Sequence, residues 1–79
     1  MNKNIEVDFY IPNERMAIQV SYSIDDPITK EREVKTLRKI SEVFPIKQTL
    51  IITRDEEQTI SDGNLTIEVL PIWKWLLME

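Results

Sequence analysis

Oxygen-bearing side chains on two neighbouring segments are the residues whose types and spacing could support metal binding or catalysis. Glu6 and Asp8 lie two residues apart in the first segment, and Gln19 and Ser21 lie two apart in the second. Residues two apart on a strand share a face, so pairing of the two segments would place all four side chains together. Their oxygens would suit Mg²⁺, which takes oxygen ligands and keeps several waters. The alternative is a solvated polar face of an antiparallel sheet, without any ligand.

Composition excludes most other chemistry. The 79 residues include no cysteine and no histidine, which rules out disulfides, zinc fingers, thiol nucleophiles and histidine-based acid–base groups. The single glycine, Gly63, rules out the glycine-rich loops that bind nucleotide phosphates. Ten Lys and Arg against fourteen Asp and Glu give a net charge of −4, which does not favour a dedicated nucleic-acid binder.

Length and hydropathy favour one small folded domain, residues 1–79. Hydrophobic residues make up 42% of the chain and charged residues 30%, as in a folded rather than a disordered protein. No run approaches the roughly 20 apolar residues that span a bilayer, and the first residues do not form a signal peptide. We therefore expect a soluble cytoplasmic protein with no membrane contact.

The first elements follow from a period of two. Residues 5–11 and 16–23 alternate apolar and polar side chains around the turn 12–15, which predicts an antiparallel hairpin. Its polar face would carry the four oxygen-bearing side chains. Its apolar face would carry Val7, Phe9, Ile18, Val20 and Tyr22.

A helix and three more strands complete the prediction. Asp25-Asp26-Pro27 indicates the start of a helix over 28–44, because an Asp can cap a helix and Pro27 suits its first position. The β-branched run 49–53 predicts a strand buried on both faces, beside a parallel neighbour. Segments 58–60 and 65–69 flank the turn 61–64 and predict a second hairpin, which a short helix over 72–78 follows. The fold class is therefore α/β (α+β), with a mixed sheet in the order β-β-α-β-β-β-α. The apolar stripe of the long helix would be Val34, Leu37, Ile40, Ser41 and Phe44.

These segments, in this order, resemble the C-terminal domain of prokaryotic AAA-type ATP-binding proteins, which has a restriction-endonuclease-like core of the PD-(D/E)-x-K type. The resemblance covers nearly the whole chain from Ile5 onward. It implies a domain truncated at its N-terminus that works with an ATPase domain elsewhere in the parent polypeptide. The matching segments are Glu6-Val7-Asp8-Phe9, Ile18-Gln19-Val20-Ser21-Tyr22-Ser23, Thr29-Lys30-Glu31-Arg32-Glu33, Leu50-Ile51-Ile52-Thr53, Asp55-Glu56-Glu57 and residues 67–77.

The resemblance assigns Asp8 to the first metal carboxylate of that core, Gln19 to the acidic position of the catalytic triplet and Ser21 to its lysine. Gln19 keeps an oxygen but no charge, and Ser21 cannot supply the cation that stabilises a developing phosphorane. The triplet is therefore degenerate. Rescue would need residues from other positions: Lys30 or Lys35 for the lysine, and Glu6 or Glu33 for the carboxylate.

Two further groups of side chains are candidates for partner contacts. Arg32, Lys35 and Lys39 form a basic stripe that is either a phosphate-binding surface or a solvated helix face with pairs such as Glu31–Lys35. Trp73 and Trp75 point in opposite directions on a helix. We expect one tryptophan to pack on the sheet with Leu76 or Leu77, and the other to lie at the rim or to contact a partner.

The leading expectation is a non-catalytic accessory or interaction domain with a degenerate nuclease-like core and no cofactor of its own. The first alternative is a Mg²⁺-dependent nuclease that uses Asp8 with Glu6 or Gln19. The second is a self-association module, giving a homo-oligomer, because an exposed sheet edge can pair with another copy. Nucleic acid is a partner that only the resemblance implies.

Overall fold

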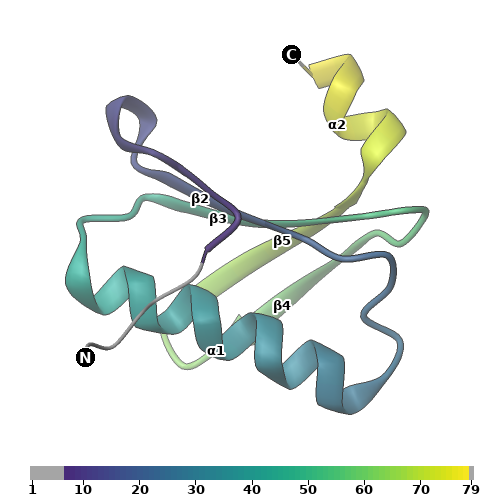
Figure 1. Cartoon of the computed structure of the whole chain (residues 1–79), viewed down its shortest axis with the longest axis horizontal. Helices are drawn as coiled ribbons and strands as arrows, with labels where there is room; N and C mark the ends of the chain where they lie inside the picture. The colour runs from purple at the N-terminus through teal and green to yellow at the C-terminus, as the bar shows by residue number, and fades with distance from the viewer. Residues whose placement is uncertain (1–6, 79) are drawn as a thin grey trace.

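Five strands form one mixed sheet in the computed structural model, which describes residues 7–78 (Figure 1). The strand order is β1-β2-β3-β5-β4; the outer pairs β1–β2 and β5–β4 are antiparallel, whereas β2–β3 and β3–β5 are parallel. The predicted α/β (α+β) class and the order of the elements are confirmed. The elements are β1 (Phe9–Ile11), the 3₁₀ turn η1 (Pro12–Glu14), β2 (Met16–Val20), α1 (Pro27–Val43), β3 (Gln48–Thr53), β4 (Gln58–Asp62), β5 (Leu65–Pro71) and α2 (Ile72–Met78).

The long helix α1 begins and ends where the sequence predicts. The carboxylate of Asp26 accepts hydrogen bonds from the backbone N–H and the hydroxyl of Thr29, at 3.2 and 3.1 Å. Pro27 occupies the first turn, where no intrahelical donor is needed. Pro45 follows the last turn and cannot continue the helix. Within residues 7–78, neither helix is long and apolar enough to cross a membrane.

The buried face of α1 differs from the predicted stripe at both ends. Leu37 and Ile40 are buried, as predicted. Glu33 is buried as well, four residues before Leu37, and the apolar stripe did not include it. Phe44 is 43% exposed, and its ring lies against Tyr10 with the ring centroids 5.0 Å apart. The buried face therefore contains a carboxylate at one end and a half-covered aromatic ring at the other.

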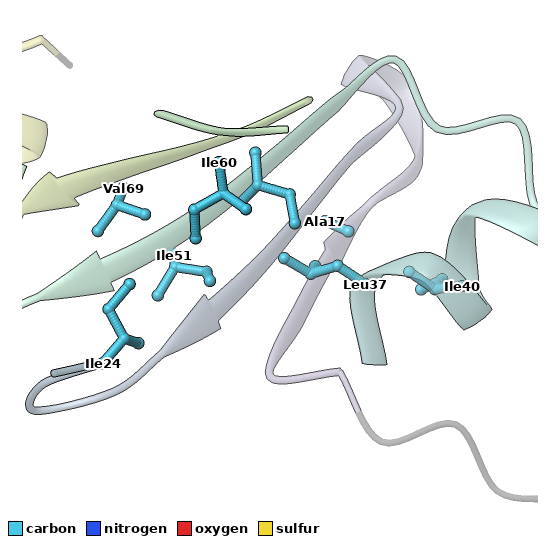
Figure 2. Packing of buried hydrophobic residues seen from close by; sticks show 8 residues of the cluster. Ala17, Ile24, Leu37, Ile40, Ile51, Ile60 and Val69 are labelled. Carbon is cyan, nitrogen blue, oxygen red and sulfur yellow. The ribbon is translucent and has the colours of Figure 1, made fainter. Parts of the chain in front are cut away.

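The main core lies between α1 and the sheet (Figure 2). Strands β2 to β5 and α1 contribute to this layer, and Ile24 joins it from the loop before α1. A smaller cluster on the opposite face contains Ile18, Leu50, Ile52 and Leu70. β3 therefore has buried side chains on both faces, as its continuous apolar run predicts. The buried members of the main core are Ala17, Ile24, Leu37, Ile40, Ile51, Ile60, Ile67 and Val69.

The first hairpin forms, but β1 is shorter than the predicted strand, and residues 5 and 6 lie outside the described part of the chain. Phe9 pairs with Ile18 and lies on the same side of the sheet. Val7 packs against the main core on the opposite side. The prediction that Val7 and Phe9 share a face is therefore wrong. The alternation breaks at Asp8, whose backbone N–H bonds to the side chain of Gln19 rather than to a strand.

The second hairpin confirms the turn predicted at 61–64. Asp62 pairs with Leu65 across a two-residue loop, and Gly63 in that loop has φ 65°, which glycine adopts without strain. Arg38 of α1 donates from Nε to the Asp62 carboxylate at 3.1 Å and from Nη2 to the Asp62 carbonyl at 2.9 Å. These bonds tie the tip of the hairpin to α1.

Arg15 adopts a left-handed backbone conformation between η1 and β2, with φ 51° and ψ 47°. Residues that carry a Cβ atom are strained there, whereas glycine is not. The Arg15 carbonyl accepts the N–H groups of Lys47 and Gln48 at 2.7 and 3.2 Å. The strained turn therefore also anchors the loop that leads into β3.

Replacing Arg15 with glycine is expected to raise the free energy of unfolding by about 0.5 kcal/mol, because the strain relieved exceeds the entropy cost of the new glycine. Urea unfolding followed by circular dichroism measures the change. Glu14→Gly is the matched control, since Glu14 lies in η1 without a positive φ and should lose stability on substitution. Equal losses in the two variants would contradict the backbone conformation at Arg15.

Candidate functional site

The polar face predicted for the first hairpin is only partly exposed. Gln19 lies on the face of β2 that α1 covers and is 5% exposed, on the same face as the fully buried Ala17. Asp8 is exposed just before β1. The expectation of an open polar face is therefore wrong at Gln19. The cause is the connection between β2 and β3, because the crossover helix of a parallel strand pair lies over one face of the sheet.

Gln19 joins Asp8 to Glu33 of α1 through a chain of hydrogen bonds. The backbone N–H of Asp8 donates to Gln19 Oε1 at 2.8 Å, and Gln19 Nε2 donates to Glu33 Oε1 at 2.6 Å. Asp8 Oδ2 in turn accepts the backbone N–H of Val20 at 2.8 Å. Glu33 is only 9% exposed. Both polar ends of the Gln19 amide thus have partners, as a buried amide requires.

This arrangement is poorly suited to hold a metal ion. The Gln19 oxygen already accepts a hydrogen bond, and residues 7–78 contain no group of three or more carboxylates placed to share a cation. Glu6, the other predicted ligand, lies outside the described residues. Ser21, where the resemblance expects a lysine, donates its hydroxyl to the carbonyl of Ser23 at 3.0 Å. The polar groups at this end of β2 are therefore engaged in holding strand, loop and helix together.

The two lysines predicted to replace the catalytic lysine lie elsewhere. Lys30 and Lys35 line a groove between α1 and β4. β4 is at the opposite edge of the sheet from β1 and three strand positions from β2, a separation of about 14 Å. Neither lysine joins Asp8 and Gln19, whereas Glu33, named as a replacement carboxylate, does reach Gln19.

The basic stripe of α1 is divided between two environments. Arg32 and Lys39 are exposed outside the groove, whereas Lys35 lies on its rim. The predicted ion pair between Glu31 and Lys35 is wrong. The ion pairs within the described part of the chain are Arg38–Asp62 and Glu57–Lys74. Binding of phosphates by the stripe stays a prediction.

Glu56, in the loop between β3 and β4, is a structural residue that no local pattern marked. Its Oε2 accepts the hydroxyl of Ser23 at 2.7 Å and its Oε1 accepts the backbone N–H of Ile24 at 2.8 Å. Its own N–H donates to Thr53 Oγ1 at 2.9 Å. Glu56 thus ties its loop to the segment between β2 and α1. The sequence gives no signal for this contact, since the partners are 33 and 32 residues away.

Apolar side chains of the second face of the sheet and of α2 line a shared groove, and we name this groove the α2-side surface. Trp75 packs against the buried cluster on that face, as predicted for one tryptophan, whereas Trp73 is 56% exposed. Leu76 and Leu77 are 58% and 79% exposed, so the prediction that one of them packs on the sheet is wrong. The α2-side surface has a volume of about 300 Å³ and is lined by Phe9, Ile11, Ile18, Val20, Ile52, Ile72 and Trp75.

The chain is similar to part of a longer protein. It is 38% identical over 82 residues to the uncharacterized protein MJ1544 of Methanocaldococcus jannaschii. The alignment covers 95% of this chain and 18% of that relative, so the chain spans less than a fifth of the relative's length. No family model matches the chain, and no solved structure does.

Replacing Gln19 with leucine is expected to lower the free energy of unfolding by about 2 kcal/mol, because the buried Glu33 carboxylate loses its hydrogen-bond donor. The double variant Gln19→Leu, Glu33→Leu should recover most of that loss, since it removes the unsatisfied charge as well. Urea unfolding of the two variants gives the difference. A double variant less stable than Gln19→Leu alone would show that this hydrogen bond does not govern the packing of α1 on β2.

Proposed function

We propose that this chain is a non-catalytic interaction domain, with a degenerate nuclease-like core, of a larger AAA-type ATP-binding protein. The α2-side surface docks it onto the rest of that polypeptide. The observation that carries the proposal is the exposure of this apolar surface beside a sheet whose other face is covered by α1.

The composition of the surface supports docking rather than solvation. Phe9 and Val20, which line this surface, are 56% and 50% exposed, and Ile72 is 41% exposed. Contiguous apolar patches are limited on monomeric proteins, and large ones mark interaction sites. Every side chain that lines the groove is apolar, and tryptophan is enriched where interfaces gain most of their binding energy. A partner that covers the surface gains about 25 cal/mol for each Å² of apolar area removed from water.

The state of the nuclease-like residues supports a role without catalysis. The oxygen of Gln19 is engaged by the backbone of Asp8, and Ser21 supplies a hydroxyl where the resemblance expects a lysine. A cation is the group that would stabilise charge developing on a phosphate during cleavage. The resemblance to the C-terminal domain of AAA-type proteins, and the match to a small part of a longer relative, support the assignment to a larger polypeptide.

The proposal predicts a Walker-type ATPase encoded in the same reading frame as this sequence or directly beside it. Co-expression of that ATPase with the chain is expected to yield a complex on size-exclusion chromatography. The double variant Phe9→Ser, Val20→Ser should lose the complex, because both side chains line the groove of the α2-side surface and are at least half exposed. The matched control is Ile28→Ser, Val43→Ser, which changes apolar side chains of α1 that are 71% and 60% exposed.

A coding region without an ATPase would contradict the proposal, and so would equal complex formation by the two double variants. Light scattering of the chain alone tests the self-association alternative. A dimer that the variant Phe9→Ser, Val20→Ser converts to a monomer would assign the α2-side surface to a second copy instead.

A second candidate function is Mg²⁺-dependent phosphodiester cleavage, and the observation that favours it is the hydrogen bond that brings Glu33 to Gln19 beside Asp8. We expect no binding heat on calorimetric titration with Mg²⁺ and no cleavage of plasmid or single-stranded DNA, because Gln19 offers no charge and no free oxygen. Gln19→Glu, which restores the acidic position, is the gain-of-binding control. Binding heat in the unaltered chain that disappears in Asp8→Ala would favour the nuclease.

A further inference from the structure

β4 is an edge strand that has a helix beside it and no further strand. Within the described sheet it pairs only with β5, from Gln58 opposite Val69 to Asp62 opposite Leu65. In an antiparallel pair, alternate residues turn their N–H and C=O groups away from the partner strand. The outer backbone groups of β4 are therefore available to another strand, which is the arrangement that proteins with exposed edges use for pairing.

A groove of about 550 Å³ lies between β4 and α1. Its apolar lining includes Val34 of α1, half-buried, and Ile60 of β4, which is 9% exposed. Lys30 and Lys35 stand on the α1 side. A strand added to β4 would place every second side chain toward this groove, because alternate side chains of a strand point to the same face.

The direction of α1 matches that of β4. A crossover helix runs opposite to the parallel strands that it joins, so α1 is antiparallel to β2 and β3. β5 is parallel to β3, and β4 is antiparallel to β5. The helix α1 and the strand β4 therefore run in the same direction. The hydrogen bonds from Arg38 to Asp62 align the two elements at one end. From Lys30 to Arg38 the helix advances about 12 Å, and from Gln58 to Asp62 the strand advances about 13 Å. The groove is lined by Ile60, Ser61 and Asp62 of β4, so it follows the C-terminal part of the edge strand.

The charges around the groove favour an anionic occupant. Arg38 and Asp62 neutralise each other as an ion pair. The remaining charged side chains of the lining are Lys30 and Lys35 against the single carboxylate of Glu31. The two lysines are about 7.5 Å apart along the helix axis, close to the roughly 6.8 Å between alternate residues of a strand. Around the helix axis the two lysines lie about 140° apart and flank the groove, so acidic side chains of an extended segment lying in it would pass between them.

We propose that the groove between β4 and α1 binds an extended acidic segment of a partner protein, which adds to β4 as a sixth strand and places carboxylates within reach of Lys30 and Lys35 on either side of the groove. Main-chain hydrogen bonds provide affinity in this mode of recognition, and the side chains facing the groove provide selectivity. A second copy of this chain is a weaker fit, because its own β4 carries one acidic residue, Asp62, which is paired with Arg38. The inference goes beyond the proposed docking function, since it concerns a different surface from the one around α2.

An NMR titration of the isotope-labelled chain tests the proposal. The probe is the synthetic heptapeptide Val-Thr-Glu-Thr-Glu-Thr-Val, acetylated and amidated, whose first, third, fifth and seventh side chains share one face. Saturable shifts are expected at the amides of residues 58–62 and 30–38. Affinity should fall as salt rises, because the carboxylates and lysines stay partly exposed.

The double variant Lys30→Glu, Lys35→Glu is expected to bind about tenfold more weakly, since two ion pairs become repulsive contacts. Arg32→Glu, Lys39→Glu is the matched control, because these exposed residues of α1 do not line the groove and should leave the affinity nearly unchanged. Each variant is checked for folding by its amide spectrum.

A second measurement does not depend on any variant. The same heptapeptide with N-methyl groups at alternate residues should lose binding, because it cannot donate hydrogen bonds to the edge of β4. The proposal would be overturned by an absence of saturable shifts at millimolar peptide, by shifts confined to the α2-side surface, or by equal binding of the N-methylated peptide. Equal binding of the heptapeptide with lysine in place of glutamate would also overturn it.

Discussion

The hydrogen bond between Gln19 and Glu33 constrains how α1 lies on the sheet. It joins two buried polar groups beside the main apolar core, and leaving either group unsatisfied would cost about 1–3 kcal/mol. A shift of α1 along its axis would separate the pair. With Glu33 held on β2, Leu37 and Ile40 follow on the same side of the helix and enter the main core, and Arg38 reaches Asp62. This polar contact therefore helps to fix the register of α1 on the sheet.

The same contact explains why Asp8 and Gln19 do not form an open metal site. A catalytic metal needs oxygen atoms that are free of other partners and open to solvent and substrate. Here the amide of Gln19 is used on one side by the backbone of Asp8 and on the other by Glu33. The Gln19 amide supports the fold, and this role agrees with the proposal of a domain that binds rather than cleaves.

The incomplete covering of the sheet leaves two different surfaces for partners. A chain of 79 residues buries a limited share of its surface, and here α1 covers one face while α2 reaches only part of the other (Figure 1). The α2-side surface is apolar and suits a lasting contact that excludes water. The groove between β4 and α1 combines an unpaired strand edge with two lysines and suits an extended charged segment. The two surfaces differ in chemistry, so the two proposals concern partners of different kinds.

Local chemistry in the sequence determined the elements and their order. Asp26 and Pro27 begin α1, the continuous apolar run 49–53 makes β3 a strand buried on both faces, and Gly63 allows the turn of the second hairpin. The tertiary structure alone decided which polar residues are covered. Alternation with a period of two shows which side chains share a face of the strand. It does not show which of the two faces meets the helix. The break at Asp8, the burial of Gln19 and the contacts of Glu56 each depend on a partner far along the chain, and only the packing of α1 and the loops on the sheet brings those partners together.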